Sequence, residues 1–306
     1  MRLLGVNMFM AEYCLARHSQ PFPAPLNQAT VSALAAWHVN SVRIVVSANC
    51  WLGLDGAPRQ MSSAAYRQSI RSFVGLLDSA HIYVILALED YTKDARGAKK
   101  AYTASPLLDA TTGPALLTSV ATEFKDFPNV MYDLYGEPGF ISWTCWLRGC
   151  TDSGTQYIGM QQMIDVVRQA GARQILILGG VIHAENLGGW VSNEPTDPDH
   201  ELVASVAVYQ HTECGTLRCW NSSIASTASH VPVITTEVGD KTCSTSFLQS
   251  YMDWADQHDL SYIAWAWTVG KCTGGGPLLA SYSGQPSTYG TTLKDHLTEL
   301  YESGNG

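Results

Sequence analysis

The sequence has little charge and no long hydrophobic run. Only 15% of its 306 residues are charged, and the longest apolar runs, such as Ile82 to Leu88, are strand-sized and far too short to cross a bilayer. The 18 Lys and Arg residues form no basic run and are outnumbered by 27 Asp and Glu residues, which gives a net charge of -9. We therefore expect neither a nucleic acid nor a membrane as a partner.

Sequence motifs of several enzyme classes are also missing. No Gly-x-Gly-x-x-Gly follows the first apolar run, and neither His-Glu-x-x-His nor Gly-x-Ser-x-Gly occurs anywhere. These absences argue against a doubly wound dinucleotide-binding sheet, a zinc protease and an α/β-hydrolase. The acidic residues have no obvious set of further metal ligands around them, so we expect no metal and no other cofactor.

Cysteine is plentiful, because eight cysteines are many for a cytosolic enzyme. A zinc site is the alternative to disulfides, but it lacks Cys-x-x-Cys spacing and a matched histidine pair. We therefore favour an oxidising compartment and a secreted protein in its mature form, since no signal peptide precedes Leu3. Spacing does not prove connectivity, but it favours the pairs Cys145–Cys150, Cys214–Cys219, Cys14–Cys50 and Cys243–Cys272.

Short apolar runs alternate with longer amphipathic stretches along the whole chain. The apolar runs predict strands over Leu3–Phe9, Ser41–Ser47, Tyr83–Leu88, Val130–Tyr135, Gln174–Leu178, Val203–Tyr209, Val233–Thr236 and Tyr262–Trp267. The amphipathic stretches predict helices over Asn27–His38, Ala64–Ala80, Pro114–Lys125, Gln156–Ala170, Ser222–Ser229, Thr245–His258 and Thr291–Tyr301. The fifth crossover is weak, because Asn193–His200 is rich in Pro, Asn and Asp and predicts at most a short helical turn.

This alternation predicts an α/β fold, a (β/α)₈ barrel. Continuous apolar runs suit strands that are buried on both faces, as the parallel strands of a barrel are. With 46% hydrophobic residues and no linker or short-period repeat, the chain is expected to form a single domain over residues 1–306.

A barrel places its reactive groups at the carboxyl ends of the strands. The fourth predicted strand ends at Tyr135-Gly136-Glu137-Pro138, and the seventh ends at Thr236-Glu237-Val238-Gly239. Each glutamate alone would be read as a solvated loop residue. Two carboxylates at one mouth are what acid-assisted glycoside cleavage requires, because one protonates the leaving oxygen while the other attacks the anomeric carbon or activates water.

These residues resemble the cellulase-like glycoside hydrolase family 5, a family of retaining barrel glycosidases. Leu134-Tyr-Gly-Glu-Pro is similar to its Asn-Glu-Pro motif on strand four, and Thr236-Glu-Val-Gly to its nucleophile motif on strand seven. Short motifs on other strands agree in order: Gly5-Val-Asn, Val42-Arg-Ile, Leu178-Gly-Gly with Gly189-Trp, Ile263-Ala-Trp-Ala-Trp, and Gly276-Pro-Leu-Leu with Tyr289-Gly.

The resemblance assigns roles residue by residue. Glu137 corresponds to the acid/base and Glu237 to the nucleophile. Arg43 corresponds to an arginine beneath the nucleophile, where a guanidinium would keep Glu237 ionised and oriented. Tyr209 corresponds to a tyrosine that hydrogen-bonds the nucleophile. The sugar-binding tryptophan of strand eight corresponds to Trp265 or, less closely, to Trp267.

Three positions depart from the family pattern. Gly136 stands where the family has an asparagine that contacts the sugar 2-hydroxyl, and Ala207 stands where it has a histidine. The third strand ends in Glu89-Asp90 instead of the common Asp-x-His. Glu89 and Asp90 either contact substrate and raise the pKa of Glu137, or pair with nearby basic residues of the loop from Lys93 to Lys100.

Several further side chains are candidates for sugar contact. Trp51, Trp143 and Trp190 follow strands, and their flat faces suit pyranose rings, although tryptophan is also a good core residue. His183 and His211 follow strands five and six, and His211 is a candidate to replace the missing histidine at position 207.

The resemblance implies a secreted, retaining endo-β-glycosidase that hydrolyses β-1,4-glucan, with a polysaccharide or oligosaccharide as its partner and a monomeric state. A β-mannanase is the alternative within the family, because Gly136 lacks the 2-hydroxyl contact and mannose presents that hydroxyl axially. Two alternatives of other classes are a carbohydrate-binding barrel with little catalysis and a barrel that uses a glutamate as a general base on a non-sugar substrate.

Overall fold

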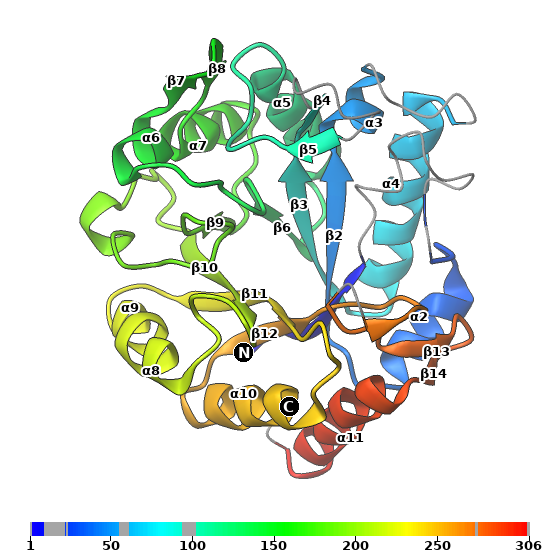
Figure 1. The fold of residues 1–306 in the computed structure, drawn as a ribbon. Helices are drawn as coiled ribbons and strands as arrows, with labels where there is room; N and C mark the ends of the chain where they lie inside the picture. Colours follow the sequence, from blue (N-terminus) through cyan, green and yellow to red (C-terminus); the bar gives the residue numbers. More distant parts are fainter. Residues whose placement is uncertain are drawn as a thin grey trace.

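Parallel strands close into a barrel with helices around it (Figure 1). The computed structural model describes residues 2–8, 22, 24–54, 61–93, 102–272 and 275–304. Around the barrel the strands follow one another in chain order, and the last pairs with the first. They are β1 (Leu4–Met8), β2 (Ser41–Ser47), β3 (Tyr83–Glu89), β6 (Val130–Asp133), β9 (Leu176–Gly179), β10 (Leu202–Tyr209), β11 (Val233–Gly239) and β12 (Ser261–Ala264). The predicted (β/α)₈ barrel is confirmed.

Successive residues of the barrel strands point to opposite faces and pack in two separate hydrophobic cores. Residues that point into the barrel, such as Ile85, pack against Leu3, Met131, Ile177, Ile234 and Ile263. Their neighbours Val84 and Leu86 belong to the larger core between the barrel and its helices. Both faces of a strand are therefore apolar, which explains why the strands appear in the sequence as continuous apolar runs.

The helices begin where the sequence offers a capping side chain. Asn27, Ser62, Ser244 and Ser287 each accept a hydrogen bond from a backbone N–H in the first turn of the helix that follows. The helices are α2 (Gln28–Ala35), α3 (Ala48–Leu52), α4 (Ser63–Ser79), α5 (Gly113–Phe124), α6 (Trp143–Arg148), α7 (Met160–Gln169), α8 (Leu217–Cys219), α9 (Ala225–Ala228), α10 (Thr245–Gln257) and α11 (Thr288–Glu302).

Short antiparallel strand pairs lie outside the barrel sheet. They are β4 (Tyr91–Lys93) with β5 (Tyr102–Ala104), β7 (Cys150–Asp152) with β8 (Thr155–Tyr157), and β13 (Leu279–Ser281) with β14 (Gln285–Pro286). The prediction of a helix over Gln156–Ala170 is wrong at its start, because residues 155–157 pair with β7 and α7 begins at Met160. Where the sequence predicts one helix over Ser222–Ser229, the chain forms a π-helix, η2 (Trp220–Ile224), followed by α9.

Disulfides close three loops of the described chain, Cys145–Cys150, Cys214–Cys219 and Cys243–Cys272, as predicted. The first lies across α6, so this stretch is helical where the sequence suggested a loop. The remaining prediction, Cys14–Cys50, includes Cys14, which lies outside the described residues.

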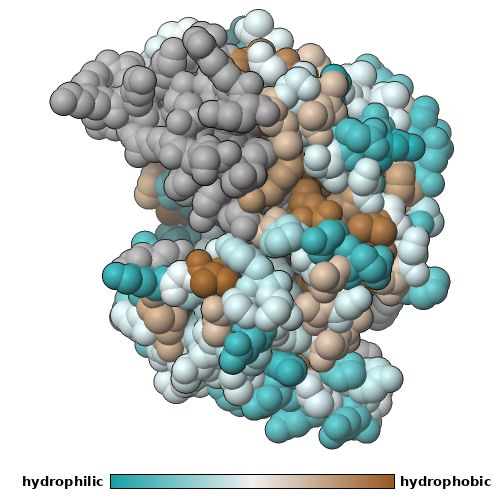
Figure 2. Space-filling view, turned by 90° about the vertical axis from the view of Figure 1, so that its right-hand side faces the viewer, coloured by the Kyte–Doolittle hydropathy of each residue, from teal (hydrophilic) through white to brown (hydrophobic). Residues whose placement is uncertain are grey.

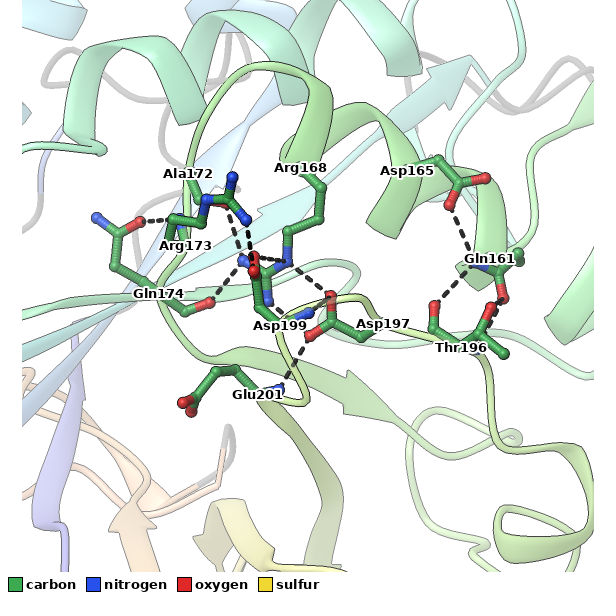
Figure 3. Close-up of polar contacts among 10 residues, drawn as sticks. All are labelled: Gln161, Asp165, Arg168, Ala172, Arg173, Gln174, Thr196, Asp197, Asp199 and Glu201. Carbon is green, nitrogen blue, oxygen red and sulfur yellow. Dashed lines mark hydrogen bonds and ion pairs between the residues drawn. The ribbon is translucent and has the colours of Figure 1, made fainter.

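The fifth crossover is held by an ion-pair network instead of an α-helix (Figure 3). After the short 3₁₀ turn η1 (Val191–Asn193), the chain reaches Asp197, whose carboxylate accepts two hydrogen bonds of 2.8 Å from Arg168 on α7. Arg168 also donates to the carbonyl oxygens of Ala172 and Gln174. Such a two-point guanidinium–carboxylate contact fixes the loop that leads into β10.

Asp197 is expected to contribute stability that is lost in acid. Its hydrogen bond to Arg168 lowers the pKa of its buried carboxyl to about 2 from 3.8. The stabilisation, about 2 kcal/mol, is fully present above pH 3.8 and disappears as the pH falls through 2. Urea unfolding should therefore show that Asp197→Asn costs about 2 kcal/mol at pH 7 and less than about 1 kcal/mol at pH 2.

The exposed Asp165, which bonds Gln161 on the solvent side of α7, provides the control. Asp165→Asn should change the unfolding free energy by less than about 0.5 kcal/mol at either pH. An Asp197→Asn penalty that is equally large at pH 7 and pH 2 would contradict the assignment.

On the face displayed in Figure 2, apolar residues form small areas among polar ones. Within the described ranges, no helix is both long and apolar enough to cross a membrane.

Candidate active site

A β-bulge aims Glu237 into the mouth of the barrel. Along β10 and β11, Val206 pairs with Thr235 but Ala207 pairs with Glu237, so Thr236 is an extra residue on β11. Bulges re-aim a side chain next to many active sites. Glu137 lies at the same end of the barrel, four residues beyond the last residue of β6.

Two donors hold the carboxylate of Glu237. Nη1 of Arg43, on β2, donates to Oε1 at 2.8 Å, and the hydroxyl of Tyr209, at the end of β10, donates to Oε2 at 2.7 Å. Burial, followed by the charge of Glu237, raises the pKa of Tyr209 well above its ordinary value, so its hydroxyl stays a donor. The structure thus brings together three residues that the sequence assigned to one site.

Arg43 connects several strands beneath the mouth. Its Nε donates to Asp133 on β6 at 2.9 Å, and its Nη1 donates to the side chain of Asn7 on β1 at 3.0 Å. Burial opposes the charge of Arg43, but Asp133, Glu237 and Glu89 more than compensate and raise its pKa above the usual value. Burial raises the pKa of Asp133, and Arg43 partly offsets that rise. The guanidinium therefore stays charged at every pH of interest.

Asp133 and Asn7 are site residues for which the sequence analysis gave no role. Both are fully buried, and Asn7 also donates to the carbonyl of Thr236 at 2.9 Å, which supports the bulge before Glu237. One signal was available, because each is a polar residue inside an otherwise apolar strand, and buried polar groups need partners.

Glu137 has a different environment. Its side chain is 35% exposed, and Oε2 lies 3.9 Å from Nδ1 of His183 in the turn after β9. Burial, followed by the negative charges of Glu237 and Glu89, raises its pKa well above 4.5, while Arg43 opposes the rise. One glutamate of the pair is therefore held by two donors, and the other is favoured in its protonated form.

Glu89 should influence the pH profile through Glu137. Because the charge of Glu89 raises the pKa of Glu137, removing that charge in Glu89→Gln lowers it. If protonated Glu137 is required, activity falls as the pH rises through its pKa, so the alkaline limb of kcat/KM should move to lower pH in this variant. The profile of Glu299→Gln, a change on the exposed face of α11, should match the unmodified protein. An alkaline limb unmoved in Glu89→Gln contradicts the coupling.

The Glu89 carboxyl lies next to the space that a side chain at position 136 would need. A Cβ at position 136 would lie 2.6 Å from Nη2 of Arg43 and 3.1 Å from Oε1 of Glu89. Glu89, at the end of β3, is 4% exposed. The glycine thus leaves room that the Glu89 carboxyl and the Arg43 guanidinium fill, so these two departures from the family pattern belong together.

Trp265 follows the end of β12 and lies near Tyr209. It is partly exposed, and its backbone N–H donates to the carbonyl of Val238 at 2.8 Å. A Cβ on Gly275 would lie 2.6 Å from the Trp265 ring and 3.3 Å from the ring of Tyr209. Gly275 has φ of +115°, which suits glycine and lets its backbone pass close to both rings. The position of Trp265 is consistent with a sugar-binding face.

Three tryptophans expected to contact sugar lie in the core instead, and these expectations are corrected. Trp51 and Trp190 have no exposed surface, and Trp267 is 2% exposed. Trp51 donates to Ser119 and Trp190 to the carbonyl of Leu178, so their indole N–H groups are satisfied internally. Trp267 packs edge-on against the ring of another core residue, Trp37. Each ring fills space between the barrel and its surrounding helices or loops.

The remaining candidates lie at the periphery. Trp143 is partly exposed and packs edge-on against Trp146 and closely against the backbone of Gly189. His211 is exposed in the turn after β10 and interacts electrostatically with Asp240. Ala207 is buried opposite Glu237.

Within the described residues, no group of three or more His, Cys, Asp or Glu side chains could hold a metal ion. A cavity of about 490 Å³ lies at the opposite end of the barrel from the glutamates, where apolar residues such as Leu3, Met131 and Ile234 line it. Because that end carries the amino-terminal ends of the strands, the site belongs at the mouth with Glu137 and Glu237.

A (β/α)₈ barrel with glutamates at the ends of β6 and β11 is the architecture of a glycoside hydrolase. The protein belongs to glycosyl hydrolase family 5, because the family model, Cellulase, matches residues 5–271. The resemblance stated from the sequence is thereby confirmed. No curated protein sequence gives a significant match.

Solved structures of endoglucanases share the fold. A variant of the endo-β-1,4-glucanase from Xanthomonas axonopodis pv. citri aligns with a TM-score of 0.74 at 16% identity, over 98% of this chain and 100% of that chain. A hyperthermophilic endocellulase from the archaeon Pyrococcus horikoshii aligns with a TM-score of 0.71 at 14% identity, over 97% and 93%. The catalytic domain of the major endoglucanase from Xanthomonas campestris pv. campestris aligns with a TM-score of 0.68 at 15% identity, over 97% and 94%.

Proposed function

We propose that the protein is an endo-acting retaining β-glycosidase that hydrolyses β-1,4-linked glucan. Membership of family 5 supports the glycosidase activity, and the solved neighbours described as endoglucanases support the substrate. We extend the proposal to a catalytic domain that spans residues 1–306, acts as a monomer and is secreted, as its disulfides suggest.

The different environments of the two glutamates support the proposed mechanism. Glu237 accepts hydrogen bonds from Arg43 and Tyr209, which orient it as a nucleophile. Glu137 has a raised pKa, which keeps a proton available for the leaving group. Pairs of carboxyl groups whose environments separate their protonation states are typical of acid and nucleophile roles.

In the first step, a carboxylate oxygen of Glu237 forms a bond to the anomeric carbon while the bond from that carbon to the glycosidic oxygen breaks. The proton of Glu137 moves to the departing oxygen. In the second step, Glu137 takes a proton from water, the water oxygen bonds to the anomeric carbon, and the carboxylate of Glu237 leaves. The proton balance closes, and both glutamates return to their starting states.

A second candidate is β-mannan hydrolysis by the same steps. Position 136 carries no side chain, and the Glu89 carboxyl lies against the space where one would extend. This change beside Glu137 alters the contacts offered to the sugar and favours a test on mannan as well as glucan.

The test is release of reducing sugar from soluble β-glucans, β-mannans and xylans. We expect the largest rate on β-1,4-glucan and loss of most of that rate in Glu237→Gln. Glu299→Gln, a carboxylate-to-amide change on exposed α11, is the matched control and should keep full activity.

Each other outcome identifies a different function. A preference for mannan that depends on Glu237 supports the second candidate. Sugar binding without hydrolysis would make the protein a carbohydrate-binding barrel, and neither binding nor hydrolysis would point to a non-sugar substrate. Full activity in both Glu237→Gln and Glu137→Gln would overturn the glutamate assignment.

A further inference from the structure

Three consecutive residues after β9 have left-handed backbone conformations. Ile182, His183 and Ala184 have φ values of 58°, 54° and 61°. This conformation is unfavourable for any residue with a side chain, and most unfavourable for a β-branched residue such as Ile182. Strained backbone of this kind persists where surrounding contacts over-determine it, and it often accompanies a functional site.

Hydrogen bonds hold this turn on both sides. The N–H groups of Ile182 and His183 donate to the carbonyls of Gly139 and Pro138, at 3.0 and 2.7 Å. On the other side, the N–H of Ala207 on β10 donates to the carbonyl of Ala184 at 2.9 Å. The turn is therefore fixed directly to the segment that follows Glu137.

The turn places the His183 ring beside Glu137, and the ring of Phe140 packs against His183. Nδ1 of His183 lies 3.9 Å from Oε2 of Glu137, and the His183 side chain is 45% exposed. The ring of Phe140 stands edge-to-face with the His183 ring, with centroids 5.1 Å apart, and Phe140 is 78% exposed. Both rings thus present open surface, and the His183 ring does so next to the carboxyl that the proposed mechanism uses as the acid.

A single exposed apolar side chain needs no explanation by itself. Here the exposed ring comes with a strained turn whose N–H groups bond the carbonyls of Gly139 and Pro138, the two residues before Phe140. Both rings project from the core, because Phe140 is 78% exposed and the His183 side chain is 45% exposed.

We propose that Phe140 and His183 form the binding platform for the sugar on the leaving-group side of the scissile bond. This inference rests on the proposed function, because an acid that protonates the glycosidic oxygen lies next to the sugar that departs. The Phe140 ring supplies a face for the C–H groups of a pyranose, and the His183 ring nitrogens supply hydrogen bonds to its hydroxyl groups. His183 additionally acts as a positioning residue for the carboxyl of Glu137.

The test compares substrates with and without a sugar as the leaving group. Cellotetraose has a sugar as its leaving group and places it on the platform. The leaving group of β-cellobiosyl fluoride is a fluoride ion, which places no sugar there. We expect Phe140→Ala to lower kcat/KM for cellotetraose about tenfold and to leave kcat/KM for the fluoride unchanged. Phe140→Trp should keep the activity on both substrates, because it keeps an aromatic face.

His183→Asn tests the second ring, since asparagine tolerates the left-handed conformation better than most residues. It should also lower kcat/KM for cellotetraose more than for the fluoride. Tyr301→Ala is the matched control, because Tyr301 is an exposed aromatic that stacks on a histidine, His38, on the far helix α11. It should affect neither substrate.

If Phe140→Ala lowers both rates equally, or neither, while the unmodified protein hydrolyses cellotetraose, the platform is wrong and the proposed function stands. If the unmodified protein hydrolyses the fluoride and no oligosaccharide, the platform is also wrong. If it hydrolyses neither substrate, the proposed function on glucan fails and the platform fails with it.

Discussion

Azide should restore turnover to a protein in which Glu237 has been replaced by glycine. Glu237→Gly removes the carboxylate that Arg43 and Tyr209 hold, and we expect hydrolysis of an activated aryl β-glycoside to fall at least about 10⁴-fold. The glycine leaves a space beside the anomeric carbon that a small anion can enter. Azide then attacks that carbon directly and produces the α-glycosyl azide.

The stereochemistry of the product identifies the role of each glutamate. Direct attack by azide in Glu237→Gly inverts the anomeric carbon once. In Glu137→Gly the nucleophile is intact, so azide replaces water in the second step and the product is the β-glycosyl azide. Proton NMR of the two products distinguishes these anomers. A β-azide from Glu237→Gly, or no rescue in either variant, would contradict the proposed double displacement.

The order of strands and helices could be predicted from the sequence because the barrel imposes a simple pattern. Strands such as β3 are apolar on both faces, so β3 appears in the sequence as the uninterrupted run Tyr83–Leu88. Local hydrogen bonding that opposes this pattern could not be predicted. The hairpin of β7 and β8 replaced the expected first turn of a helix, because it depends on pairing with residues held by the Cys145–Cys150 disulfide.

The placement of Glu137 and Glu237 at one end of the barrel could be predicted because a strand end fixes where a side chain starts. The direction in which a ring then points is not fixed by that position. Trp51 and Trp190 both follow strands, yet each turns into the core, where a large apolar ring loses more water-exposed area than it would against a sugar. Burial of this kind is a property of the assembled loops and helices.

The contact between Arg43 and Asp133 could not be predicted from the sequence. Arg43 and Asp133 are 90 positions apart and lie on strands separated by β3, so their contact exists only once the sheet has curved into a barrel. Gly136 and Glu89 looked like two separate departures from the family pattern. The structure puts them in contact, so one opens a space that the other fills.

Arg43→Met should cost both stability and activity. The change removes the guanidinium from the fully buried Asp133 and from Asn7, and breaking a buried ion pair in this way typically costs about 3–5 kcal/mol. It also removes a donor from Glu237, and loss of one such charged contact typically lowers kcat by about 10²–10³-fold. Urea unfolding and kcat/KM on the best substrate measure the two effects. Arg71→Met, which breaks a half-exposed pair with Glu123, should cost less than about 1 kcal/mol.

The double variant Arg43→Met with Asp133→Asn separates the two roles. Neutralising Asp133 removes the unpaired buried charge, so at least about 2 kcal/mol of stability should return. The activity should stay low, because Asp133 does not contact Glu237 and the missing donor to Oε1 is not replaced. If stability and activity recover together, Arg43 acts on catalysis only by keeping the barrel folded. Recovery of stability alone would establish that Arg43 orients the nucleophile as well as bridging the strands beneath it.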